Sequence, residues 1–273
     1  MAMAVAIADP DTCIERPHAM KALFSSDALN PGVRLREVFG WAMYDFANSG
    51  YTTVVITAVF AAYFVGGVAQ GASWATLAWT VGLSISYAIV MLTMPGLGAW
   101  ADRTAGKKRL LMTVTAACVL STAALAWVGP GQVALGLCLL IVSNTFFSYG
   151  ESLTASFLPE LARPEAMGRV SGWGWALGYI GGMLTLGVCL AYVLAAQARG
   201  ESGSQFVPVT MLITALVYGA AACVTFALLK EHTPAQPDAP VVGMLQSLRQ
   251  LRQTFRDARP YKDFTRLMAC AVA

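Results

Sequence analysis

Two carboxylic acids, Asp45 and Glu151, stand within long apolar stretches of the sequence. Removing a charge from water is costly, so an ionisable side chain inside such a stretch is a functional candidate by default. Neither stretch contains a Lys or Arg that could neutralise its acid. A carboxyl group without a counterion in apolar surroundings favours its neutral, protonated form. The two acids are therefore predicted proton or ligand sites.

Polar side chains accompany both acids at helical spacing. The residues that would share one face of each helix are Asp45, Asn48 and Thr52 in the first stretch, and Asn144, Ser148 and Glu151 in the second. Asp45, Asn48, Asn144 and Glu151 are thus predicted to line a substrate or proton pathway. Two alternatives stay open: Asp45 bonds or caps neighbouring helix backbone, and Glu151 pairs with Arg169.

Membrane-spanning helices must position these residues. The chain of 273 residues is 57% hydrophobic and only 12% charged, against roughly 25% charged residues in soluble domains. Six apolar runs are close to or above the roughly 20 residues that cross a bilayer. Because lipid offers no hydrogen bonds, runs of this length should be helical. The predicted spans cover 38–65, 74–100, 110–128, 132–156, 170–196 and 206–229.

Basic residues lie on one side of these spans. If the chain alternates across the bilayer, 17 of its 18 Lys and Arg residues fall on the side of the N-terminus, and only Arg199 falls opposite. Basic connections remain in the cytoplasm. We therefore expect a multi-pass membrane protein with a cytoplasmic N-terminus, in a bacterial cell membrane or, alternatively, a vacuolar membrane.

The remaining segments complete the domain organisation. Residues 1–35 are expected to form a cytoplasmic tail, residues 36–229 a six-helix bundle, and residues 230–263 a cytoplasmic linker with an amphipathic basic helix. That helix could rest on the anionic inner leaflet or pack against cytoplasmic loops. A seventh apolar run, 264–273, reaches roughly 15 Å, about half the hydrocarbon thickness. It is interpreted as the truncated start of a further helix.

A loop with a distinctive pattern of glycine, acidic and basic residues connects the second and third spans. It contains Gly98, Asp102, Arg103, Gly106 and Lys107. This pattern resembles the signature loop of the major facilitator superfamily, with one additional residue before Gly106. The resemblance implies that Asp102 and Arg103 help to hold two transporter halves in one conformational state. They would be gate elements and not substrate ligands.

Further motifs resemble one family within that superfamily. They include Trp41-Ala-Met-Tyr-Asp45-Phe-Ala-Asn48 and Phe157-Leu-Pro-Glu-Leu-Ala162, followed by the glycine-rich stretch 168–182. Together they are similar to the vacuole effluxer family, typified by the autophagy-related amino-acid permease of yeast. The resemblance covers roughly residues 36–270 and implies an all-α fold that corresponds to the N-terminal half of a twelve-helix transporter.

The fifth span carries glycines at four-residue spacing. Gly174, Gly178 and Gly182 leave one helix face without side chains, so a partner helix can pack closely there. This contact is either a static packing surface or a hinge about which the partner helix moves.

Several function classes are disfavoured by composition. The six cysteines are scattered and the two histidines lie outside the spans, so no metal site is predicted and the cysteines are interpreted as packing residues. A net charge of +3 gives no indication of nucleic acid. There is no nucleotide-binding Gly-Lys-Ser/Thr loop for ATP-driven pumping, and no convincing nucleophile–base pair for an enzyme. No cofactor is expected.

The favoured interpretation is secondary transport of a small solute by alternating access. Amino acids are candidate substrates, and either Asp45 or Glu151 would exchange a proton during transport. The expected partners are the solute, the lipid bilayer, and a C-terminal half or a second copy of the chain. The alternative is a half-length membrane protein that scaffolds or regulates a partner without transporting.

Overall fold

A computed structural model describes residues 26–232 together with residues 234, 253 and 256. Six helical spans are long and apolar enough to cross a membrane: Leu35–Val68, Ala75–Thr104, Lys107–Trp127, Val133–Leu161, Pro164–Ala198 and Gly203–Leu228. The predicted all-α membrane fold is confirmed. Most of the predicted basic helix and all of the seventh apolar run lie outside the described residues.

The spans are built from the following elements. In chain order they are η2 (Ser26–Ala28), α2 (Leu35–Tyr51), η3 (Thr52–Ala58), α3 (Val59–Tyr63), η4 (Phe64–Val68), α4 (Ala75–Thr104), α5 (Lys107–Ala124), η5 (Leu125–Trp127), α6 (Val133–Leu161), η6 (Pro164–Ala166), α7 (Met167–Ala198) and α8 (Gly203–Leu228). At about 1.5 Å per residue, even the 18 residues of α5 extend about 27 Å.

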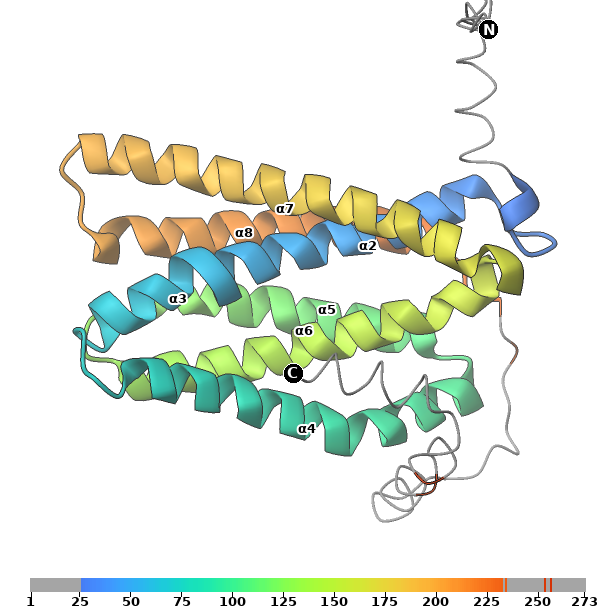
Figure 1. The fold of residues 1–273 in the computed structure, drawn as a ribbon, viewed down its shortest axis with the longest axis horizontal. Coiled ribbons are helices and arrows are strands. Elements are labelled where there is room, and N and C mark those ends of the chain that lie inside the picture. The colour runs from blue at the N-terminus through green and yellow to red at the C-terminus, as the bar shows by residue number, and fades with distance from the viewer. Residues whose placement is uncertain (1–25, 233, 235–252, 254–255, 257–273) are drawn as a thin grey trace, which may run out of the picture.

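The helices form two groups of three. In Figure 1, α7, α8 and α2 lie together in one group, and α4, α5 and α6 in the other. Within the groups, α2 packs on both α7 and α8, while α6 packs on both α4 and α5. Contacts between α5 and α8 join the groups on one side. The first span therefore packs against both of the other helices in its group, α7 and α8.

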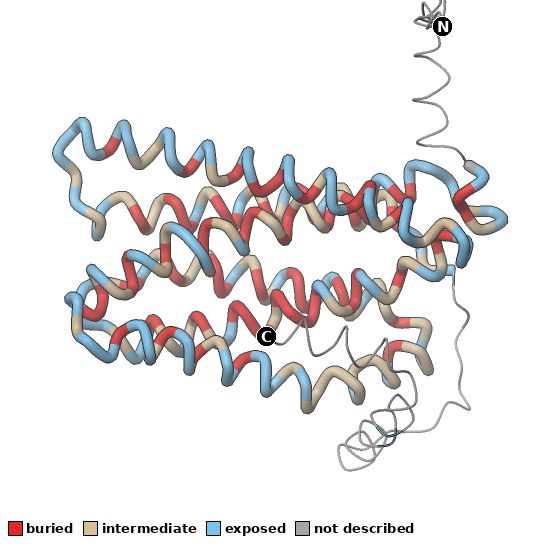
Figure 2. The backbone as a smooth tube through the Cα atoms, viewed as in Figure 1, coloured by how far each residue is buried: buried red, intermediate tan, exposed pale blue. Residues whose placement is uncertain are grey.

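Apolar side chains cover the outside as well as the inside of the bundle. Figure 2 shows exposed positions along the outer faces of α4 and α7, with buried positions between the helices. Leu120, Trp127 and Leu216 each expose at least 70% of their surface. In water this surface would be unfavourable, whereas in lipid it has no cost. The exposed apolar surface is that of a membrane protein.

The first span is not a uniform α-helix. Two segments, η3 and η4, have π-helical hydrogen bonding, and the Thr57 hydroxyl donates to the Thr52 carbonyl five residues earlier at 2.9 Å. Each wider turn rotates the following faces relative to an α-helix, and such turns occur frequently at functional sites. The first π-helical segment begins at Thr52, immediately after α2, the helix that carries Asp45 and Asn48.

Candidate substrate-binding site

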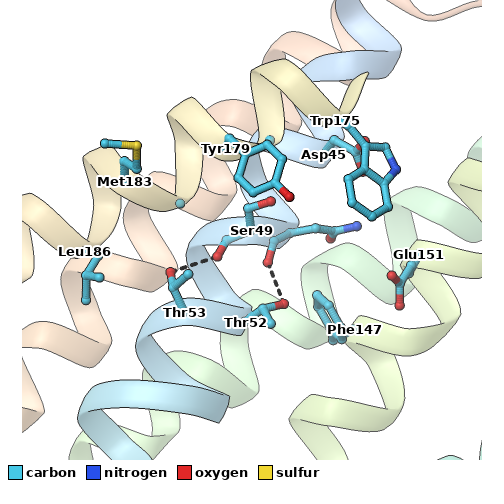
Figure 3. Close-up of a pocket in the computed structure, with 13 residues that line it drawn as sticks. Asp45, Ser49, Thr52, Thr53, Phe147, Glu151, Trp175, Tyr179, Met183 and Leu186 are labelled. Carbon is cyan, nitrogen blue, oxygen red and sulfur yellow. Dashed lines mark hydrogen bonds between the residues drawn. The ribbon is translucent and has the colours of Figure 1, made fainter. Parts of the chain in front are cut away.

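A cavity of about 360 Å³ lies between the first span, α6 and α7 (Figure 3). Its lining consists of Asp45, Asn48, Ser49, Thr52, Thr53, Phe147, Glu151, Trp175, Gly178, Tyr179, Gly182, Met183 and Leu186. Asp45, Glu151 and Trp175 lie at one end, and Met183 and Leu186 at the other. The cavity thus has an acidic, aromatic end and an apolar end.

The two acids reach this cavity from different helices. Asp45 is half-buried on α2, and Glu151 is exposed on α6. Among the described residues, no basic side chain forms an ion pair with either acid. The predicted alternative of a Glu151–Arg169 pair therefore has no counterpart in this part of the chain. Two carboxyl groups share one cavity without a cation.

Asp45 fits where α7 lacks side chains. A Cβ added at Gly174 would lie 2.9 Å from Asp45 Oδ2 and 2.7 Å from the Trp41 ring. A Cβ added at Gly178 would lie 2.9 Å from the Ser49 hydroxyl, and one at Gly182 would lie 3.3 Å from Ser49 Cβ. The structure thus places the glycine face of α7 directly on the polar face of α2.

Asn48 is held by a buried network of hydroxyl groups. Tyr218 of α8 donates its hydroxyl to Asn48 Oδ1 at 2.8 Å. The same hydroxyl lies 3.3 Å from the Tyr44 hydroxyl, which in turn bonds the Thr115 hydroxyl at 2.8 Å. Among the described residues, the amide NH₂ of Asn48 has no hydrogen-bond partner, and Asn48 lines the cavity. The network fixes this side chain between α2, α5 and α8.

The hydroxyl groups of the two threonines in the cavity, Thr52 and Thr53, donate their hydrogen bonds to nearby backbone carbonyls of the same span. Thr52 donates to the Asn48 carbonyl at 3.1 Å, and Thr53 donates to the Ser49 carbonyl at 2.8 Å (dashed lines in Figure 3). Such bonds to the preceding turn are common for Thr in helices. Their oxygens remain hydrogen-bond acceptors. A ligand that donates hydrogen bonds therefore finds more partners here than one that accepts them.

Asn144 lies elsewhere. It is fully buried and donates its amide to the Ser86 hydroxyl at 2.6 Å, which joins α6 to α4. Ser148 is also buried, and its hydroxyl has no hydrogen-bond partner among the described residues. The structure therefore brings Asp45, Asn48 and Glu151 together around one cavity and places Asn144 in a helix–helix contact.

The predicted gating loop lies at the end of the bundle where α4, α6 and α8 finish and α5 and α7 begin (Figure 1). Lys107 Nζ is 3.3 Å from Asp102 Oδ1 and 2.9 Å from Glu160 Oε1. The lysine thus joins α4, α5 and α6. At the turn before Gly106, Ala105 adopts a left-handed conformation with φ of 46°.

Two acids that the sequence analysis did not single out complete this end of the bundle. Glu231 follows α8 and accepts hydrogen bonds from the backbone N–H groups of Lys107 and Lys108 at 3.0 and 3.2 Å. It thereby caps the N-terminus of α5. Glu37 is buried at the start of α2 and lies 2.6 Å from His232 Nε2. Their partners are distant in sequence, so no local spacing indicated these contacts.

The aromatic lining was also missed. Trp175, Tyr179 and Phe147 contribute rings to the cavity, and Trp175 contacts Tyr179 edge-on with ring centroids 6.2 Å apart. In a helix that is apolar on every side, an aromatic residue has no sequence signal that separates a cavity wall from a lipid-facing surface. Spacing does help in retrospect, because Trp175, Tyr179 and Met183 recur every fourth residue beside the glycine face.

Six apolar spans, three of which border a cavity lined by two acids, define a polytopic membrane protein. Residues 61–270 match the family described as "Vacuole effluxer Atg22 like". The chain belongs to this family of transporters, and the resemblance seen in its motifs is confirmed.

A relative from Bacillus subtilis (strain 168) is described as an uncharacterized MFS-type transporter, YxiO. It is 31% identical over 229 residues, which cover 81% of this chain and 53% of the relative. The chain therefore spans about half the length of that relative. No solved structure matches the chain.

Proposed function

We propose that the chain forms one half of a secondary transporter that moves a small solute by alternating access. The observation that carries this proposal is the cavity of about 360 Å³, which is lined by two carboxyl groups that lie within membrane-spanning helices. Solute sites of such transporters lie near the bilayer midplane, at the interface of structural repeats. A C-terminal half or a second copy of the chain would complete the transporter and cover the open side of the cavity.

Asp45 and Glu151 are the proposed proton site. Each lies within a span, lines the cavity and lacks a basic partner among the described residues. A carboxyl group in this setting can be neutral in one state of the transporter and charged in another, as water access changes. Proton exchange at one of the two acids would couple solute movement to a proton gradient.

The network around Lys107 is the proposed gate. Its contacts to Asp102 on α4 and to Glu160 on α6 hold the ends of three helices together. In the proposed orientation this end faces the cytoplasm, because 17 of the 18 basic residues would then be on the cytoplasmic side. We place the protein in a bacterial cell membrane, with the Bacillus relative as support.

Counterflow into liposomes tests the transport function. The longest reading frame that contains this chain would be purified, reconstituted and screened with labelled amino acids and peptides at two pH values. We expect flux above that of protein-free liposomes, and a changed pH profile in Asp45→Asn or Glu151→Gln. The matched control is Glu165→Gln, which removes an exposed acid outside the cavity. Absence of flux for every solute would contradict transport. An unchanged pH profile in both variants would remove the proton role.

A further inference from the structure

The charge of the cavity restricts what it can bind. Asp45 and Glu151 supply two carboxyl groups, whereas the lining formed by the described residues contains no Lys or Arg. Two carboxylates in one partly apolar cavity are compensated best by a ligand of the opposite charge. A solute that brings a carboxylate or phosphate would instead add a third acid. The cavity is therefore suited to a positively charged solute.

Aromatic rings stand next to the acids. Trp175 and Tyr179 are 64% and 65% exposed, so nothing in the described part of the chain covers them. Both line the cavity from α7, while Phe147 lines it from α6. Aromatic faces attract ammonium groups, most strongly for Trp and in surroundings without water. The rings thus favour the same class of ligand as the acids, on independent grounds.

The shape of the cavity determines where the apolar portion of a cationic ligand would lie. Met183 and Leu186 form the wall at the end opposite the acids (Figure 3). A volume of about 360 Å³ lies at the low end of the range for sites that hold small organic molecules. A ligand that fills it would place a charged group near Asp45 and an apolar body near Met183.

We infer that the solute is an amphipathic organic cation, with a protonated amine held by Asp45 and Glu151, its charge facing Trp175 and Tyr179, and an apolar portion against Met183. This inference rests on the proposed transport function and narrows its substrate class. A zwitterionic amino acid would need a cation for its carboxylate, and the described cavity offers none.

Isothermal titration of the chain in lipid nanodiscs tests the inference with three ligands of similar shape. They are 2-phenylethylammonium, 2-phenylethanol and phenylacetate. We expect the ammonium compound to bind at least about tenfold more tightly than the alcohol, because only the ammonium group forms charge-assisted hydrogen bonds with the carboxylates, and the carboxylate to bind least. Equal affinities for the three ligands, or tightest binding of phenylacetate, would overturn the inference.

Variants locate the binding. Asp45→Asn and Glu151→Gln should each weaken the ammonium ligand about tenfold or more, while Glu165→Gln should leave its affinity unchanged. Trp175→Leu should weaken the ammonium ligand roughly three- to tenfold, with a smaller effect on the alcohol. Trp175 is exposed, so the fold should tolerate its replacement, and an unchanged thermal transition would verify this. Full affinity in all three cavity variants would overturn the inference.

Titration with an amino acid distinguishes a failure of the organic-cation inference from a failure of the proposed transport function. Leucine would be titrated in parallel with 2-phenylethylammonium. Tight binding of leucine that is lost in Asp45→Asn, without binding of the amine, would leave a transporter site in place and reject the organic-cation class. Absence of binding for every ligand, together with absent flux in liposomes, would reject the proposed function itself.

Discussion

The Asp45 carboxylate of α2 lies against Gly174 of α7, so closely that a Cβ at position 174 would come within 2.9 Å of Asp45 Oδ2. The absence of a side chain on one helix therefore provides the space for the ionisable group on the other. Close helix approach in lipid depends on small residues of this kind. Here the same position also determines how an acid is presented to the cavity.

Replacement of this glycine gives the first prediction. Gly174→Ala should lower the stability of the bundle by about 1–3 kcal/mol, because the new methyl group must displace both Asp45 and the Trp41 ring. It should also reduce transport. The matched control is Gly172→Ala in the same helix, since a Cβ there meets nothing within 4 Å. Thermal unfolding in detergent measures the difference. Equal midpoints for the two variants would show that α2 and α7 are not tightly packed.

The hydrogen bond between Tyr218 and Asn48 supports a second prediction. Tyr218→Phe keeps the ring but removes the donor, at an expected cost of about 1 kcal/mol for a buried bond. Asn48 can then rotate, so solute affinity should fall together with stability. Tyr87→Phe is the control, because Tyr87 is exposed and its hydroxyl forms no hydrogen bond within the described residues. If both variants bind solute equally, the network has no role in positioning Asn48.

The left-handed residue of the gating loop gives a third prediction. Ala105 has φ of 46°, a conformation that costs a residue with a Cβ roughly 1–2 kcal/mol. Glycine avoids this cost but loses more chain entropy on folding. Ala105→Gly should therefore raise stability by a net gain of about 0.5–1 kcal/mol. Ala99→Gly, within helix α4, should lower it by about 1 kcal/mol. Chemical denaturation would reveal the opposite signs, and two losses would refute the strain at Ala105.

Capping of α5 leads to a fourth prediction. Glu231→Ala leaves the backbone N–H groups of Lys107 and Lys108 without their acceptor, and caps of this type are worth about 0.5–2 kcal/mol. The predicted loss is of that size. Glu231→Gln keeps one acceptor and should lose less. Glu165→Ala, which removes an exposed acid near the start of α7, should have little effect. Hydrogen exchange of the first turn of α5 would locate the loss, and unchanged protection there would exclude the cap.

Hydropathy was sufficient to find each of the six spans that the structure describes, because a helix that crosses the bilayer must be apolar along its whole length. The boundaries shifted by a few residues, for example from 74–100 to Ala75–Thr104. The π-helical segments of the first span could not be predicted. A helix that is apolar on all sides has no alternating pattern that would reveal a change of phase at Thr52.

The site was only partly predictable for a related reason. Spacing placed Asn144 on the same face of α6 as Glu151. The spacing alone does not indicate which neighbouring helix packs against that face at each position along α6. In the structure Asn144 meets Ser86 of α4, whereas Glu151, two turns further along, opens to the cavity. The neighbour of a helix changes along its length when helices cross. Contacts such as that of Glu231 with α5 depend on the same long-range arrangement.

Orientation in the membrane gives the last prediction, because the proposed gate must face the cytoplasm. In a background without the six native cysteines, Ser204→Cys should react with a membrane-impermeant maleimide on intact cells. Glu165→Cys should react only after permeabilisation. Both side chains are exposed, and they lie at opposite ends of α7, before it begins and after it ends. The distribution of Lys and Arg requires this pattern. The reverse pattern would place the Lys107 network outside the cell, and its assignment as a cytoplasmic gate would fail with it.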